Sequence, residues 1–128
     1  MNNKNNAYFI VNFIFVILIG IAIGYSYFFY PNNQPINCAV KELTGKACTS
    51  CGFSRAFSAF MHLKYQEGVA YNPNAFASFV FFISQFVLRT TLLCIEGFTD
   101  KLISKRVIYT EVVFTILHFL VAFTPLLL

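Results

Sequence analysis

The sequence predicts an all-α membrane protein with three transmembrane helices and a short cysteine-bearing helical loop between the first and second. Apolar residues make up 58% of the 128 residues and charged residues only 11%, whereas about a quarter of a soluble domain is charged. The mean hydropathy is +0.67. Three runs are also long and apolar enough to cross a bilayer. We expect residues 1–128 to form a single membrane domain.

The first predicted span covers residues 8–30, which carry no formal charge and are interrupted only by Asn12. As a helix this run is about 34 Å long, which is too long for the core of a signal peptide, so we expect a retained anchor. Gly20 and Gly24 form a GxxxG pattern, which lets another helix approach closely, either from a partner or from the same chain. The span ends in aromatic residues typical of a membrane interface: Tyr25, Tyr27, Phe28, Phe29 and Tyr30.

The second predicted span covers residues 73–95. Asn72 and Pro73 suit the start of a helix, because Asn caps free N–H groups and Pro fits the first turn. Gly97 is a plausible stop. Arg89 lies inside this span, where a charge at mid-bilayer costs about 2.5–3.5 kcal/mol. We therefore expect its side chain to snorkel toward the nearer membrane surface.

The third predicted span covers residues 107–128. Its connection to the second span is short, so the two are expected to form an antiparallel helical hairpin. Glu111 and His118 are seven residues apart and share one helix face. Two such residues are too few for a proton relay, which favours intramembrane hydrogen bonds, or a place at the interface for Glu111.

The distribution of Lys and Arg predicts the orientation. The N-terminal side receives Lys4, Lys101, Lys105 and Arg106, whereas four cations are spread over residues 31–72: Lys41, Lys46, Arg55 and Lys64. We predict a cytoplasmic N-terminus and an external first loop. The Asn-rich and Phe-rich composition suggests a bacterial source, and hence the bacterial cytoplasmic membrane.

The loop at residues 31–72 holds three of the four cysteines, Cys38, Cys48 and Cys51. In an oxidising compartment a structural disulfide is favoured, and closing such a loop contributes about 3 kcal/mol. Thiol–disulfide exchange at Cys48 and Cys51 is an alternative, because a helix start and Arg55 would both stabilise a thiolate. A zinc site of Cys38, Cys48, Cys51 and His62 is a reserve possibility, although strong zinc motifs usually have two close ligand pairs.

The segment after the cysteines is helix-like. Over residues 54–71 one face is apolar, and it is expected either to lie on the membrane surface or to pack under the spans. Arg55 on this segment is expected to hydrogen-bond carbonyls of the preceding turn, with an anionic lipid headgroup, Glu42 or Glu67 as alternative partners.

The cysteine motif resembles a prokaryotic membrane family catalogued as domain of unknown function 2752, whose hallmark reads C…TGxxCPxCGxTRA…NP. The matching residues are Cys38, Leu43, Thr44, Gly45, Cys48, Cys51, Gly52, Ser54, Arg55, Ala56, Asn72 and Pro73. Thr49 replaces the family's Pro and Ser54 its Thr, and a Gly-Asp step is absent near Lys64. The resemblance implies a membrane location and fold but no established activity.

The sequence lacks paired carboxylates for hydrolysis, a phosphate-binding glycine loop and a Ser/His/Asp set. Its net charge of +4 is too scattered for nucleic-acid binding. We expect a non-catalytic accessory subunit of a larger membrane complex, with no cofactor, whose partners are the lipid bilayer and other integral membrane proteins. The alternatives are a thiol-active protein and a zinc-binding one.

Overall fold

The computed structural model describes residues 3–30, 33, 39–45, 51–99 and 105–127. These residues form six helices: α1 (Asn3–Phe28), α2 (Ala39–Thr44), α3 (Phe53–Met61), α4 (Tyr65–Tyr71), α5 (Ala75–Thr99) and α6 (Lys105–Leu127). Three of them contain segments long and apolar enough to cross a membrane, namely Ala7–Phe28, Ala75–Glu96 and Lys105–Pro125. The predicted fold class, with three long apolar helices and short helices between the first and second, is confirmed.

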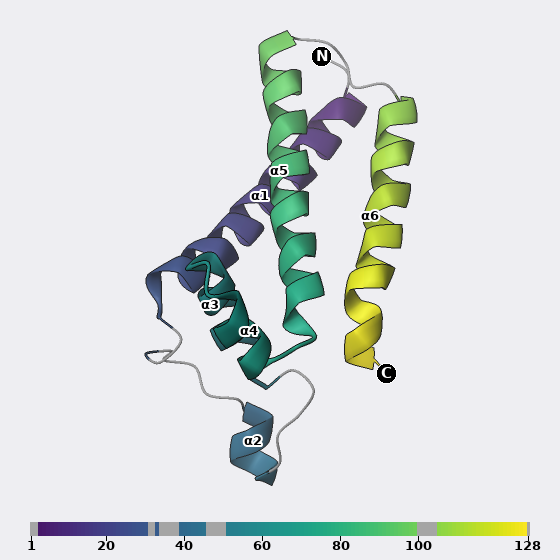
Figure 1. Ribbon diagram of the computed structural model, residues 1–128. Coiled ribbons are helices and arrows are strands. Elements are labelled where there is room, and N and C mark those ends of the chain that lie inside the picture. Colours follow the sequence, from purple (N-terminus) through teal and green to yellow (C-terminus); the bar gives the residue numbers. More distant parts are fainter. Residues whose placement is uncertain (1–2, 31–32, 34–38, 46–50, 100–104, 128) are drawn as a thin grey trace.

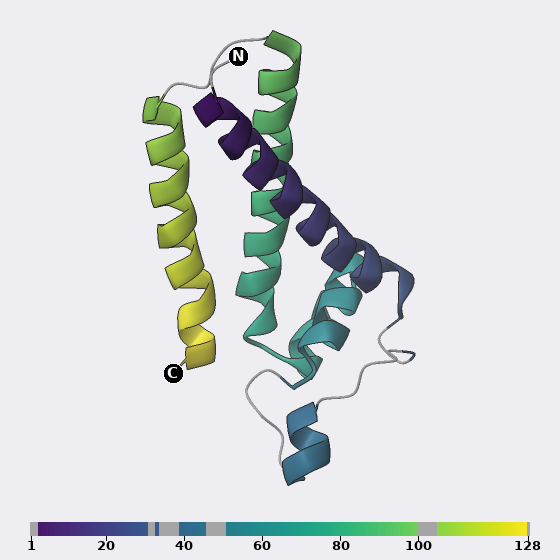
Figure 2. The same cartoon turned by 180° about the vertical axis from the view of Figure 1, so that it is seen from behind.

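The central helix of the bundle is α5 (Figure 1). Helix α1 crosses one face of α5 at a tilt, and α6 runs antiparallel beside α5 (Figures 1 and 2). Within the described residues α1 and α6 each pack on α5 but not on one another. The short helices α3 and α4 lie where α1 ends and α5 begins, and α3 packs on both.

The second span begins and ends later than the sequence predicts. The Asn72 side-chain oxygen accepts a hydrogen bond from the Asn74 N–H at 3.0 Å. The Asn72 carbonyl accepts another from the Ala75 N–H at 3.2 Å. Pro73 therefore lies in the turn before the helix. The predicted stop at Gly97 is wrong, because α5 continues to Thr99, and a glycine costs a helix only about 1 kcal/mol.

The helix-like run after the cysteines divides into α3 and α4. The apolar side of α3 packs against α1, α4 and α5, which is the second of the two predicted arrangements. Its buried core consists of Ala56, Phe60 and Ala75, with Phe53, Phe57, Val69, Tyr71 and Phe79 packed around it. In addition, the Ser58 hydroxyl donates to the carbonyl of Phe29 just beyond α1. This bond joins α3 to the end of α1.

The two short helices are separated by a turn with left-handed backbone at Leu63, where φ is 59°. The Lys64 N–H bonds to the Ala59 carbonyl at 2.9 Å and the Leu63 N–H bonds to the Phe60 carbonyl at 3.0 Å. These are the two hydrogen bonds of a Schellman motif, which usually has glycine at the left-handed position. Leu63 is 92% exposed, so its side chain adds little packing within the chain.

Replacing Leu63 with glycine is therefore expected to stabilise the protein by about 0.5–1 kcal/mol, because the left-handed backbone strains every residue with a Cβ. Thermal unfolding of the purified protein in mild detergent measures the effect. Leu43→Gly is the matched control, since Leu43 is equally exposed but lies inside α2, where glycine should destabilise. Equal destabilisation by both substitutions would contradict strain at Leu63.

Candidate functional site

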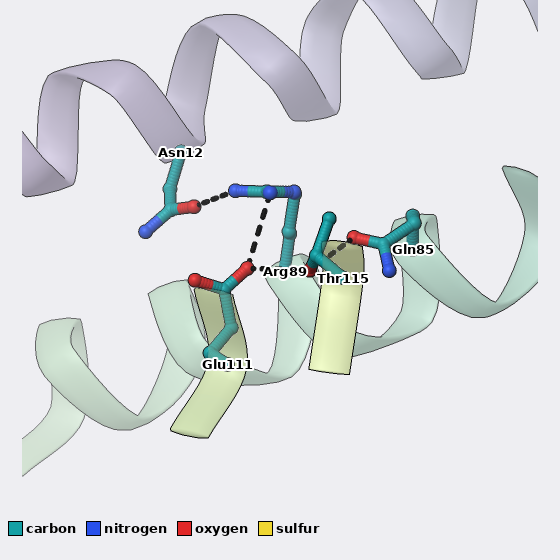
Figure 3. Close-up of polar contacts among 5 residues, drawn as sticks. All are labelled: Asn12, Gln85, Arg89, Glu111 and Thr115. Atoms are coloured by element: carbon teal, nitrogen blue, oxygen red, sulfur yellow. Dashed lines mark hydrogen bonds and ion pairs between the residues drawn. The ribbon is translucent and has the colours of Figure 1, made fainter. Parts of the chain in front are cut away.

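The most unusual feature of the spans is a buried ion pair between α5 and α6 (Figure 3). The Arg89 Nη2 atom lies 3.1 Å from Glu111 Oε1, and the two side chains are 11% and 5% exposed. Arg89 Nη1 also donates to the Asn12 side-chain oxygen of α1, and the guanidinium lies 4.7 Å from the ring centre of Phe15. Arg89 thus contacts both flanking helices, and the prediction that it snorkels to the surface is wrong.

All three polar residues of this contact lie at similar depth. Asn12 is five residues inside the start of its span, Arg89 seven residues before the end of the second, and Glu111 six residues inside the third. At 1.5 Å per residue these positions are about 8–10 Å from the same end of the bundle. The opposite charges compensate one another there, which lowers the cost of placing either in hydrocarbon.

The ion pair continues into a second polar contact between the same two helices. The Thr115 hydroxyl oxygen lies 3.3 Å from Glu111 Oε1 and 3.3 Å from the Gln85 side-chain oxygen. A hydroxyl has only one proton to donate. The hydroxyl therefore donates to one of these two acceptors, and with the Gln85 amide turned over Nε2 would donate to Thr115 while Thr115 donates to Glu111. Both Gln85 and Glu111 are buried, so this chain of hydrogen bonds is internal.

Further polar contacts follow along the whole length of the hairpin. The Asn74 side-chain amide donates to the Pro125 carbonyl at 3.2 Å, and the Ser78 hydroxyl donates to the Ala122 carbonyl at 3.4 Å. His118 Nδ1 lies 3.3 Å from the Ser84 hydroxyl oxygen.

The residues of α6 that make these contacts are separated alternately by four and three positions, so they form one continuous stripe facing α5: Glu111, Thr115, His118, Ala122 and Pro125. As the sequence predicts, Glu111 and His118 share this face. Individual hydrogen bonds between membrane helices are worth about 0.6 kcal/mol on average. Because the contacts lie in one stripe along α6, together they fix the position of α6 along α5.

The second candidate site is the cysteine motif, where Asn72 binds the backbone beside Cys51. The Asn72 side-chain amide donates to the Cys51 carbonyl at 3.1 Å, although 21 positions separate the two residues. Gly52 has φ 80°, and a Cβ at this position would lie 2.7 Å from the Tyr71 carbonyl oxygen. Gly52 and Asn72 therefore join the turn before α3 to the end of α4. These two residues of the motif therefore stabilise the contact between the start of α3 and the end of α4.

The other residues of the motif are spread around this junction. Gly45 follows α2 with φ 70°, Ser54 is half-buried, and Arg55 and Pro73 are exposed. In the part of the chain that the structure describes, Arg55 forms no ion pair with Glu42 or Glu67. Glu67 pairs with Lys64 at 3.4 Å instead.

Of the two glycines in the GxxxG pattern of α1, only Gly20 lies against another helix of the chain. A Cβ at Gly20 would lie 3.5 Å from the Phe86 ring of α5, which is ordinary contact. A Cβ at Gly24 would meet nothing within 4 Å. Gly20 therefore faces α5, whereas the surface at Gly24 is open.

The predicted disulfide, thiol exchange and zinc site depend mainly on cysteines that lie outside the described residues. Cys38 and Cys48 lie there, so the structure does not show how either pairs, while Cys51 is half-buried just before α3. His62 lies at the other end of α3, where its Nδ1 donates to the Ser58 carbonyl at 2.8 Å and its ring stacks on Tyr27.

The positions of Cys51 and His62 bear on the reserve zinc site. They are separated by the length of α3, about 14 Å for nine residues. Zinc ligands lie within about 2.3 Å of the ion, so α3 does not bring these two side chains to one metal. Among the described residues no group of three or more His, Cys, Asp or Glu side chains forms a metal site.

A family model matches part of the chain. Residues 38–86 match the model of a family described as protein of unknown function (DUF2752). The match extends from the cysteine motif through α3 and α4 into the first half of α5. No curated protein and no solved structure matches the chain. The family resemblance predicted from the cysteine motif is therefore confirmed: over residues 38–86 the chain is similar to the DUF2752 family, whose function is unknown.

Proposed function

We propose that this chain is an integral membrane protein that acts as a non-catalytic accessory subunit of a larger membrane protein complex. The observation that supports this proposal is the use of the intramembrane polar groups. Arg89 and Glu111 bond one another, and Arg89 also bonds Asn12. Reactive side chains that hold helices together suit a protein whose task is to keep a defined shape.

The outer surface of the bundle supports the same proposal. Large apolar side chains on α1 and α6 face outward, including Leu18, Ile21, Leu117 and Val121. Gly24 lies on α1 with open space above it. A surface of this kind suits both lipid and the apolar helix of a partner, and an open glycine permits close helix approach.

Affinity purification from native membranes tests the proposal. The tagged chain is produced at its natural level, extracted in a gentle detergent and analysed by mass spectrometry. A stoichiometric integral membrane partner that survives washing is the expected result. A chain that is purified alone, from membranes in which it is correctly folded, would contradict the subunit role.

The open glycine gives a specific prediction for the complex. Gly24→Leu is expected to reduce partner recovery at least tenfold, because about 1.4 kcal/mol of lost helix contact is enough for that change. A Cβ at Gly24 would meet nothing within 4 Å, so the thermal stability of the isolated subunit should hardly change. Ile21→Leu on the same helix is the matched control, and equal recovery of the partner by both variants would exclude Gly24 from the contact.

Thiol–disulfide exchange is the second candidate function, and the position of Cys51 favours it. Cys51 is half-buried and lies one residue before Gly52, the N-cap of α3, and a helix N-terminus stabilises a thiolate. Replacing both Cys48 and Cys51 with serine separates the two functions. A thiol enzyme loses activity while its fold survives, whereas a structural disulfide is lost together with stability.

We also propose that the chain lies in the bacterial cytoplasmic membrane with its N-terminus in the cytoplasm and residues 31–72 outside. The exposed Lys105 and Arg106 at the start of α6 support this orientation. Protease added to intact cells should leave an N-terminal tag uncut. Cleavage of that tag without cell lysis would reverse the orientation.

A further inference from the structure

Unsatisfied polar groups gather at the end of the bundle that holds the ion pair. The Asn12 side-chain Nδ2, the Tyr8 hydroxyl and Glu96 Oε2 are buried, and among the described residues they have no hydrogen-bond partner outside this group, in which Tyr8 and Asn12 interact with one another. Asn12 itself is only 1% exposed. Buried polar groups in a membrane cost several kcal/mol each when unsatisfied, so the donors and acceptors that this group leaves open favour a further polar partner.

The three groups face one region. Tyr8 and Asn12 are four residues apart on α1 and therefore lie on the same side of the helix. The Tyr8 hydroxyl lies next to the Asn12 side chain, and the charged groups of Arg89, Glu96 and Glu111 are near it. In Figure 3 the Asn12 amide nitrogen points away from Arg89, toward the side where the second Glu111 oxygen lies.

The Asn12 amide cannot satisfy itself by turning over. Its oxygen accepts the hydrogen bond from Arg89, and a reversed amide would present its N–H groups to the guanidinium, which has only donors. Both protons of Nδ2 therefore remain directed at the region shared with Tyr8.

We propose that Tyr8, Asn12 and Glu96 bind one or more water molecules beside the Arg89–Glu111 pair. The site offers donors at Asn12 and Tyr8 and acceptors at the carboxylates. Water matches this combination because it accepts and donates at once. A cation would face the Asn12 N–H groups and the guanidinium, and an anion would face two carboxylates, so neither fits all members of the site.

Solid-state NMR of the protein in lipid vesicles tests this site by transfer of magnetisation from water to side-chain amides of 15N-labelled asparagine. The Asn12 signal is identified by its loss in Asn12→Leu. Asn72 is the internal reference, because its amide is also buried but donates to the Cys51 carbonyl. We expect several-fold faster transfer to Asn12 than to Asn72. Slower transfer to Asn12 than to Asn72 would show that the site is dry and would overturn the proposal.

Two substitutions test which side chains hold the water. Tyr8→Phe removes one oxygen and Glu96→Leu removes the carboxylate, and each should slow the transfer to Asn12 several-fold. Glu67→Leu is the control, since Glu67 is an exposed carboxylate elsewhere, and it should leave the transfer unchanged. Unchanged transfer in both Tyr8→Phe and Glu96→Leu would contradict the assignment of the site to these residues.

Discussion

Replacing Glu111 with leucine is expected to lower the free energy of unfolding by about 3–5 kcal/mol. The substitution leaves the Arg89 guanidinium charged and buried without its carboxylate, and breaking a buried pair on one side has this cost. Arg89→Met should have an effect of similar size, because it leaves Glu111 buried without a counter-charge. Unfolding of the purified protein, followed by circular dichroism in a detergent series, measures both.

An exposed pair gives the control for this prediction. Lys64 and Glu67 lie 3.4 Å apart and both are about half exposed, so Glu67→Leu should change stability by less than about 1 kcal/mol. Equal effects of Glu111→Leu and Glu67→Leu would show that the Arg89–Glu111 contact does not stabilise the bundle.

Replacing Gly52 with alanine is expected to lower the free energy of unfolding by about 2–5 kcal/mol. The left-handed backbone at this position strains a residue with a Cβ by about 1–2 kcal/mol. The new methyl group would also lie 2.7 Å from the Tyr71 carbonyl oxygen, and overpacking of this kind costs a further 1–3 kcal/mol or so. The expected result is loss of the junction between α3 and α4, measured as reduced thermal stability and faster proteolysis of this segment.

Gly45 separates the two causes of this effect. It has a similar φ of 70°, but a Cβ there would meet nothing within 4 Å. Gly45→Ala should therefore cost only the backbone strain, about 1–2 kcal/mol. A Gly52→Ala variant as stable as Gly45→Ala would mean that the Tyr71 backbone is not held against Gly52.

The spans are well predicted because each depends only on residues that are close together in the sequence. The apolar runs, the short connection between the second and third, and the shared face of Glu111 and His118 follow from composition and helical periodicity. The end of α5 is less well predicted, because a single glycine at position 97 is a weak signal that the surrounding helix overrides.

The intramembrane cluster could not be assembled from local patterns. Asn12, Arg89 and Glu111 each stand out as polar residues in apolar runs, but they come from three different helices. A usable signal was present, because Arg89 and Glu111 have opposite charges and lie at similar distances from the two ends of the hairpin connection. Compensation by a partner is the lower-energy alternative to snorkelling when such a partner lies at the same depth.

The cysteine motif shows the same limit of sequence reasoning. The motif contains Gly52 and Asn72, yet nothing local indicates that Asn72 binds the backbone beside Cys51. The two residues are 21 positions apart with two helices between them, and only the packing of α3 on α4 brings them together. The pairing of Cys38 and Cys48 lies outside the described residues and stays a prediction.

The most direct test of a structural role for the intramembrane polar groups is genetic. A triple variant with Asn12→Leu, Arg89→Met and Glu111→Leu replaces the buried cluster by apolar side chains, a change that is often neutral or stabilising for buried ion pairs. We expect this variant to fold, to retain its partner and to replace the wild-type chain in the cell. A variant that folds and inserts normally but fails in the cell would contradict our account, because the charges would then serve chemistry beyond holding the helices together.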